Sequence, residues 1–163
     1  EAWGNNALRV RVTHNADFTE DDKALSPVLS SAQITIDDSK ASIRNGKISC
    51  VIAKSGWLEF YSDKKPILKE YYRGFGNANE HSPSMKFHAR EFKAVSGNDY
   101  SITARFESQD GEKIFGMGQY QQAYMDLKGC TLELAQRNSQ ISVPLLYQIS
   151  AMVCCGTIRL SDR

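Results

Sequence analysis

The residues best suited to chemistry lie near the end of the chain, where amide and tyrosine side chains stand between two apolar segments. The stretch Lys113–Gly129 begins as an apolar strand, passes through a glycine-flanked turn and continues as a polar loop rich in glutamine and tyrosine. It runs on through Gln136–Ser139 to Val143–Tyr147, an apolar strand entered through a proline. Glycines permit unusual backbone conformations, and amides both donate and accept hydrogen bonds. This pattern predicts a loop that presents hydrogen-bonding groups to a ligand of sugar size.

Paired carboxylates would be the clearest sign of a glycosidase, because hydrolysis of a glycosidic bond commonly needs two of them. The aspartates fall in turns or loops, where local hydrogen bonding is the usual role, and Glu70 and Glu133 fall in strand patterns, where a solvent-facing or cross-strand role is expected. No pair stands out, so we expect no catalytic residue in this chain. The candidate acids are Asp37, Asp38, Glu70, Asp110, Glu112, Asp126 and Glu133.

Nucleophile, metal and cofactor motifs are not recognisable. His14, His81 and His88 are scattered, without a nucleophile motif or metal-ligand spacing. The run Gly116–Gln121 begins like a dinucleotide fingerprint but lacks its third glycine and a following helix. We therefore expect no metal and no cofactor. The cysteines form no Cys-x-x-Cys pair and are interpreted as thiols in a reducing cytoplasm: Cys50, Cys130, Cys154 and Cys155.

Aromatic side chains offer a second route to sugar binding, because their apolar faces stack on sugar rings. Trp57, Phe75, Tyr120 and Tyr124 are the candidates. Trp57 is predicted to lie in the core. For Tyr120 and Tyr124, core and ligand roles both stay open.

Size and charge exclude several classes of protein. The chain has 163 residues, enough for one domain but too few to add a (β/α)8 barrel, which alone takes roughly 250 residues. The 20 basic and 19 acidic residues nearly cancel, so we expect neither nucleic acid nor a membrane as partner. Glu1–Val10 lacks a signal-peptide pattern and no apolar run is long enough to span a bilayer. We expect a cytoplasmic protein.

Short segments of alternating apolar residues predict an all-β fold, an antiparallel β-sandwich. Turn signals separate them, of which Asn45-Gly46 and Gly97-Asn98 suit tight hairpins. Polar, irregular stretches at 15–30 and 74–83 are predicted to be exposed loops. The predicted strands are Leu8–Val12, Ile34–Ile36, Ile48–Ile52, Leu58–Tyr61, Ile67–Tyr72, Phe87–Val95 and Tyr100–Phe106.

Three segments resemble, in order, the N-terminal domain of glycoside hydrolase family 31. Trp3–Arg11 is similar to the family's opening strand, with an arginine-flanked apolar run. Gly56–Glu70 is similar to a hairpin whose leucine-rich strand ends in a glutamate. The third and most specific match is Ile114–Gln119, which resembles the family's Tyr/Phe-Gly-Leu-Gly-Glu strand and is followed, as in the family, by an apolar strand at Val143–Tyr147. The resemblance implies a galactose-mutarotase-like sandwich from an α-glucosidase or α-xylosidase.

In this family the sandwich precedes a catalytic (β/α)8 barrel that carries both catalytic aspartates. The resemblance therefore implies an inactive chain whose partners are the barrel of the same parent and an α-linked saccharide. The parent would cleave terminal α-glycosidic bonds with retention, using carboxyl groups about 5 to 5.5 Å apart. The family's sugar-contacting acid falls on Asn138, beside Arg137, and Gln119 replaces the usual glutamate. The expected substrate-binding residues are Gln119, Tyr120, Arg137 and Asn138, with the choice of sugar left open.

The last residues depart from the family's pattern, after an expected sandwich domain of residues 1–150. The family continues with Gly-Tyr-Gly and Asn-Asn-Pro, whereas residues 151–163 read Ala-Met-Val-Cys-Cys-Gly-Thr-Ile-Arg-Leu-Ser-Asp-Arg. Codons allowed for these residues, read from the third base of the Ala151 codon, can encode Tyr-Gly-Leu-Leu-Trp-Asn-Asn-Pro. We therefore predict that this tail is the product of a shifted reading frame.

Two other classes of function remain open from the sequence. A free-standing carbohydrate-binding module would use exposed aromatic and amide side chains without a barrel, and would be polar apart from a compact aromatic platform. A mutarotase-type epimerase would need a histidine and a glutamate in one cleft, for which His88 with Glu70 or Glu133 is conceivable. A domain cut from its barrel should instead expose an apolar patch near residues 116–147.

Overall fold

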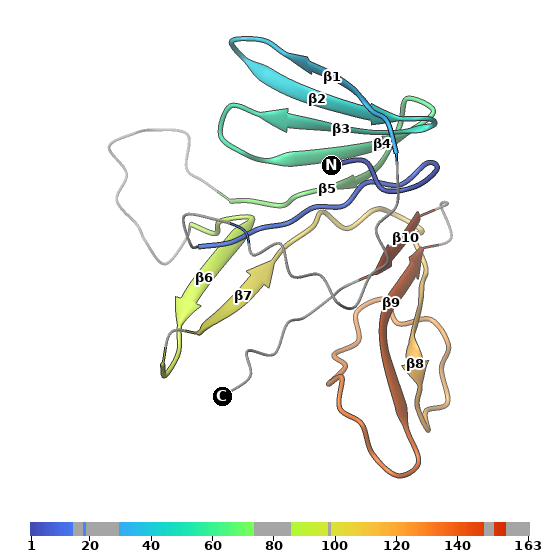
Figure 1. Cartoon of the computed structure of the whole chain (residues 1–163). Coiled ribbons are helices and arrows are strands. Elements are labelled where there is room, and N and C mark those ends of the chain that lie inside the picture. Colours follow the sequence, from blue (N-terminus) through green and yellow to red (C-terminus); the bar gives the residue numbers. More distant parts are fainter. Residues whose placement is uncertain (15–17, 19–29, 74–85, 98, 149–151, 156–163) are drawn as a thin grey trace. The chain divides into compact units, whose positions relative to one another are not determined.

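The chain folds into antiparallel β-sheets in two compact units, residues 1–107 and 108–163. A computed structural model describes residues 1–14, 18, 30–73, 86–97, 99–148 and 152–155 (Figure 1). Within these residues every regular element is a strand, and no helix is long and apolar enough to cross a membrane. The expected all-β antiparallel fold is confirmed. The strands are β1 (Gln33–Ile36), β2 (Lys40–Asn45), β3 (Ile48–Ala53), β4 (Leu58–Ser62), β5 (Lys65–Lys69), β6 (Arg90–Ala94), β7 (Tyr100–Ala104), β8 (Ile114–Gln119), β9 (Ile141–Gln148) and β10 (Met152–Cys155).

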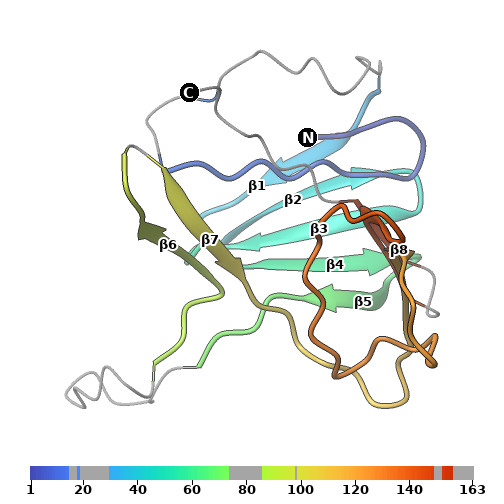
Figure 2. The same cartoon turned by 90° about the horizontal axis from the view of Figure 1, so that it is seen from below.

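The first unit contains a five-stranded sheet in the order β1-β2-β3-β4-β5, with each strand antiparallel to the next. Figure 2 shows these strands side by side, with β1 and β5 at the edges. Each strand follows its neighbour through a short turn, and Gly46 supplies the positive φ of +60° that the predicted Asn45-Gly46 hairpin requires. Local hairpins therefore account for the whole sheet.

Beyond β5 the first unit continues as a hairpin of β6 and β7. Backbone hydrogen bonds join the two parts: the Tyr71 amide donates to the Arg105 carbonyl at 2.9 Å, and the Glu107 amide donates to the Lys69 carbonyl at 2.8 Å. Predicted strands over Ile67–Tyr72 and Tyr100–Phe106 are thus shorter than expected, and their ends form a single bridge between Glu70 and Phe106.

The N-terminal segment corrects one expectation. Only Leu8 of the predicted strand Leu8–Val12 pairs, in an isolated bridge with Ala2, so residues 1–9 form a reverse turn rather than a strand. The buried Asn45 holds this turn, because its amide donates to the carbonyls of Gly4 and Ala7 at 2.7 and 2.8 Å. The segment therefore docks on the β2–β3 hairpin through side-chain hydrogen bonds.

The second unit contains a three-stranded sheet in the order β10-β9-β8. The two glycines of the predicted turn lie inside β8 instead, where the register with β9 shifts between Gly116 and Gly118. A Cβ atom at Gly118 would lie 2.0 Å from the Ile141 carbonyl oxygen, and the residue has a φ of +116°. Glycine is therefore required by a close approach of two strands, not by a turn.

The tail is only partly described. Residues 152–155 form β10, which pairs with Leu145–Gln148, while residues 149–151 and 156–163 lie outside the described part of the chain. The shifted reading frame and the domain boundary at residue 150 stay predictions. The expected loops at 15–30 and 74–83 also lie largely outside the described residues.

Candidate functional site

Gln119 and Tyr120 lie where β8 ends and the long loop of the second unit begins. Gln119 pairs with Ile141, the first residue of β9, and its side chain is exposed. The Tyr120 hydroxyl lies 2.8 Å from the Ser142 hydroxyl, which itself donates to the Ala135 carbonyl at 2.9 Å. Tyr120 is thus half-buried and fixes the loop to β9, a structural role that leaves only part of its ring open to a ligand.

Arg137 and Asn138 lie at the other end of the same loop, in a tight turn that leads into β9. The turn is closed by backbone hydrogen bonds between Arg137 and Gln140, and Asn138 is exposed at its tip. Arg137 also pairs with the carboxylate of Glu133 at 2.5 Å, where both side chains are more than half exposed. The turn therefore presents an amide to solvent beside a neutralised guanidinium.

The structure brings the predicted residues to the two ends of one loop, around the start of β9. Sequence reasoning missed Gln136, whose amide donates to the Ser142 carbonyl at 3.0 Å and accepts from the Ser142 amide at 3.3 Å. Such paired side-chain bonds imitate a strand neighbour and brace the loop. The amide-rich composition was the available signal, but it did not distinguish bracing from ligand binding.

The base of the loop is held by a carboxylate network. Asp126 accepts from the backbone amides of Ile114 and Lys128, each at 3.1 Å, and these bonds lower the pKa of Asp126. Burial alone would raise the pKa of Glu112, but hydrogen bonds from the Lys128 ammonium at 2.6 Å and from Gln148 outweigh it, so its pKa is lowered. Both groups therefore stabilise the fold as anions.

Acid should loosen this unit at the loop base. Because the folded-state pKa values of Asp126 and Glu112 lie below their unfolded values, their stabilisation is complete above about pH 4.5 and is lost as pH falls through the folded values. We expect the backbone amide signals of Ile114 and Lys128 to broaden in NMR spectra below that pH. The Asp126→Asn variant should lose part of this pH dependence; identical titrations of both proteins would contradict the assignment.

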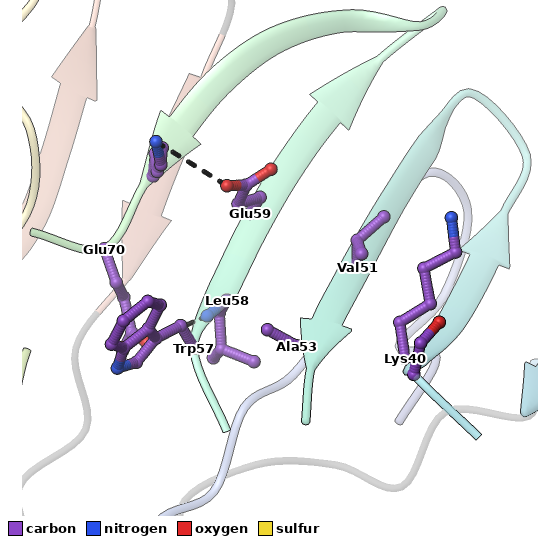
Figure 3. Close-up of a pocket in the computed structure, with 9 residues that line it drawn as sticks. Lys40, Val51, Ala53, Trp57, Leu58, Glu59 and Glu70 are labelled. Carbon is purple, nitrogen blue, oxygen red and sulfur yellow. Dashed lines mark hydrogen bonds and ion pairs between the residues drawn. The ribbon is translucent and has the colours of Figure 1, made fainter. Parts of the chain in front are cut away.

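The first unit carries a separate cavity of about 270 Å³ on one face of its sheet (Figure 3). Cross-strand pairing places Lys40 of β2 beside Ala53 of β3. On the same face, Val51 of β3 lies beside Glu59 of β4, and Glu59 lies beside Lys69 of β5. In Figure 3, Trp57 and Lys40 lie at opposite ends. The lining residues are Ser39, Lys40, Val51, Ala53, Trp57, Leu58, Glu59, Lys69 and Glu70.

Trp57 was predicted to lie in the core, and that prediction is wrong. Leu58 is buried, whereas the neighbouring Trp57 is only half-buried and lines the cavity. Its ring stacks on Tyr72, with centroids 3.3 Å apart and an interplanar angle of 23°. Of the two roles expected for Glu70, solvent-facing or cross-strand, the structure shows the second: Glu70 is buried and accepts from the Leu58 amide of the neighbouring strand, and it also pairs with Arg90.

The histidines and cysteines give no sign of a catalytic centre in the described chain. His14 stacks on Tyr100 with centroids 4.5 Å apart, and His88 is exposed. Burial raises the pKa of the Cys50 thiol to about 11, which makes it a poor nucleophile. Among the described residues no group of three or more histidine, cysteine or acidic side chains is arranged to hold a metal ion.

Comparison with known proteins finds similarity to glycosidases. The chain is 45% identical over 157 residues to a family 31 glucosidase, ORF2, of Pseudescherichia vulneris, in an alignment that covers 90% of this chain. The crystal structure of a GH31 α-xylosidase from a soil metagenome, complexed with xylose, matches 91% of the chain with 42% identity and a TM-score of 0.80. A GH31 α-xylosidase from Xanthomonas citri matches 72% with 28% identity and a TM-score of 0.57. No family model matches.

The chain spans only part of each of these proteins. It covers 30% of the P. vulneris glucosidase, 23% of the soil-metagenome enzyme and 12% of the X. citri enzyme.

Proposed function

Because this chain is related to the N-terminal β-sandwich domain of family 31 glycoside hydrolases, we propose that it is a non-catalytic domain of a retaining α-glycosidase. In this proposal it packs against a catalytic barrel of the same parent protein and supplies a loop to the barrel's substrate site. The parent would act on a terminal α-glucoside or α-xyloside.

The proposal rests on one observation: the alignment with the soil-metagenome α-xylosidase covers nearly all of this chain but only a small part of that enzyme. The chain aligns over 91% of its own length, yet over only 23% of the soil-metagenome α-xylosidase. Glycoside cleavage with retention needs a closely spaced pair of carboxyl groups. Among the acids of the described residues, Glu70, Glu112 and Asp126 are each engaged by cations or backbone amides. This supports a source of catalytic acids outside the chain.

The exposed face of β9 supports packing against a further domain. Alternate residues of the strand point to one side and remain 39 to 57% exposed: Ile141, Val143, Leu145 and Tyr147. A row of large apolar side chains on one strand face is costly in water and is typical of an interface. This apolar row lies within residues 116–147, where an apolar patch was expected for a domain separated from its barrel. The row also argues against a free-standing carbohydrate-binding module, whose surface should be polar.

Asn138 is the residue we assign to the substrate. Its amide is exposed at the tip of the Arg137–Gln140 turn. The family resemblance implies that Asn138 stands where the family uses a carboxylate to contact sugar. An amide can donate to one hydroxyl and accept from another, without adding charge. Gln119, Tyr120 and Arg137 would position the same loop.

A chimera tests this proposal. Residues 1–148 would replace the matching part of the soil-metagenome α-xylosidase, with p-nitrophenyl α-xyloside as substrate. We expect the chimera to hydrolyse it and the present chain alone to give no turnover above background. In the chimera, Asn138→Ala should lower kcat/KM about three- to tenfold, the effect of losing one neutral hydrogen bond.

Asp110→Ala is the matched control, because Asp110 lies in another exposed turn of the same unit. This variant should leave kcat/KM unchanged. Turnover by the chain alone would show that it contains its own catalytic acids and would overturn the proposal. Equal effects of the two substitutions would remove Asn138 from the substrate site.

A further inference from the structure

The cavity on the five-stranded sheet has no part in the proposed function, yet its lining suits a ligand. Its volume of about 270 Å³ is close to the lower end of the range of small-molecule sites, roughly 300 to 1,000 Å³. The cavity belongs to the first unit, whereas the loop with Asn138 belongs to the second. The cavity and the Asn138 loop therefore share no residues.

The charges around the cavity balance, which disfavours an ionic ligand. Glu59 pairs with Lys69 in the lining, and Lys40 and Glu70 also line the cavity. Glu70 is also paired with Arg90 at 2.9 Å, and Lys69 with Glu107 at 3.3 Å. The three carboxylates and three cations sum to zero, so the site has no net field to attract a phosphate or a metal ion.

Glu59 retains hydrogen-bonding capacity toward the cavity. It accepts from the Tyr61 hydroxyl at 2.7 Å, and the Lys69 ammonium lies 3.7 Å from its other oxygen. A carboxylate has about four acceptor positions, so unused positions remain. Tyr61 and Lys69 also restrict the orientation of the carboxylate. An acceptor beside an ammonium donor suits adjacent hydroxyl groups of one ligand.

Trp57 provides an apolar wall beside these polar groups. Tyr72 stacks against it and so restricts its motion before a ligand binds, which reduces the entropy cost of binding. Val51 and Ala53 continue the apolar floor between Trp57 and Lys40. A ligand with one C–H-rich face and a hydroxyl-rich edge matches this combination.

We propose that the Trp57–Glu59–Lys69 cavity binds a neutral saccharide, as a second sugar site separate from the loop around Asn138. The sugar ring stacks on Trp57, and its hydroxyls donate to Glu59 and accept from Lys69 or Lys40. Such a site holds a saccharide on the domain without cleaving it. The inference does not depend on a catalytic barrel and stands even if the proposed function fails.

Saturation-transfer NMR on the whole chain with methyl α-D-xylopyranoside and methyl α-D-glucopyranoside tests the site. We expect at least one glycoside to bind, and Trp57→Ala to weaken it at least about tenfold. Glu59→Gln retains the shape of the side chain and should weaken binding severalfold. Because Glu59 is partly exposed, Glu59→Gln should still fold. The site can therefore be tested with this variant even if Trp57→Ala does not fold.

The matched control is Tyr100→Leu, which removes an exposed aromatic residue that stacks on His14 in the same unit. It should leave sugar binding unchanged. Absence of binding of both glycosides would overturn the inference, as would binding that survives both Trp57→Ala and Glu59→Gln. Displacement of the glycoside by inorganic phosphate would also overturn it, because a neutral site should not select an anion.

Discussion

Gly118→Ala should strongly destabilise the three-stranded sheet of the second unit. The added Cβ would lie 2.0 Å from the carbonyl oxygen of Ile141, a backbone atom that can move only if β9 moves. The φ of +116° is in addition nearly closed to residues other than glycine, at a cost of about 1 to 3 kcal/mol. With the steric clash we expect a loss of about 3 kcal/mol or more, a large part of the roughly 5 to 15 kcal/mol that stabilises a typical domain.

Urea denaturation followed by the NMR signals of β8 and β9 measures this loss. Gly111→Ala is the control, because Gly111 has a φ of +69° but an added Cβ there would have no described atom within 4 Å beyond its chain neighbours. It should cost only about 1 to 2 kcal/mol, the expense of a left-handed conformation. Equal losses for the two variants would mean that β8 and β9 do not approach each other as closely as described.

The hairpins of the fold could be predicted from sequence because they depend on neighbouring residues. Asn45-Gly46 and the apolar alternation of Ile48–Ile52 identified the β2–β3 hairpin and β3 almost to the residue. The strand β2 was missed because only Ala41 and Ile43 give it an apolar face. Leu8–Val12 was predicted wrongly, since its arginines pair with Glu1 and hold a turn rather than a strand.

The site residues were harder to place because burial depends on partners far away in sequence. In Gly56-Trp57-Leu58 the sequence shows two adjacent apolar residues, but not which of them faces the interior. A strand alternates its side chains, so the burial of Leu58 turns Trp57 to the opposite face. Trp57 lines the cavity because Leu58, and not Trp57, faces the interior. Which of the two is buried depends on tertiary contacts that the local sequence does not show.

The two candidate sites are built from different residues in different units of the chain. Asn138 lies at an exposed turn of the second unit, at the position where the family resemblance implies a sugar contact. The Trp57 cavity lies in the first unit, where its aromatic wall, its balanced charges and the unused acceptor positions of Glu59 suit a neutral ligand. The chimera and the glycoside titration therefore test independent properties, and either can fail without affecting the other.

Glu70→Gln should destabilise the first unit through the loss of one buried charge. The Glu70 side chain is 2% exposed, accepts from the Leu58 amide at 2.9 Å and pairs with Arg90 at 2.9 Å. Arg90 also donates to the Gly56 carbonyl, so the pair links β6 to the β3–β4 turn and the end of β5. A glutamine turns either a donor or a weaker acceptor toward the guanidinium, and leaves Arg90 without its counter-ion.

We expect a loss of about 2 to 3 kcal/mol, below the roughly 3 to 5 kcal/mol typical of a broken buried pair because Arg90 remains partly in water. Thermal unfolding followed by tryptophan fluorescence measures it. Glu107→Gln is the matched control. The Glu107 and Lys69 side chains of that ion pair are 44% and 46% exposed, so losing the pair should cost no more than about 0.5 kcal/mol of unfolding free energy. The expectation is contradicted if both variants unfold near the unfolding temperature of the unaltered protein. In that case solvent screens the Glu70–Arg90 pair as it screens a surface pair, and only backbone bridges hold the two parts of the unit together.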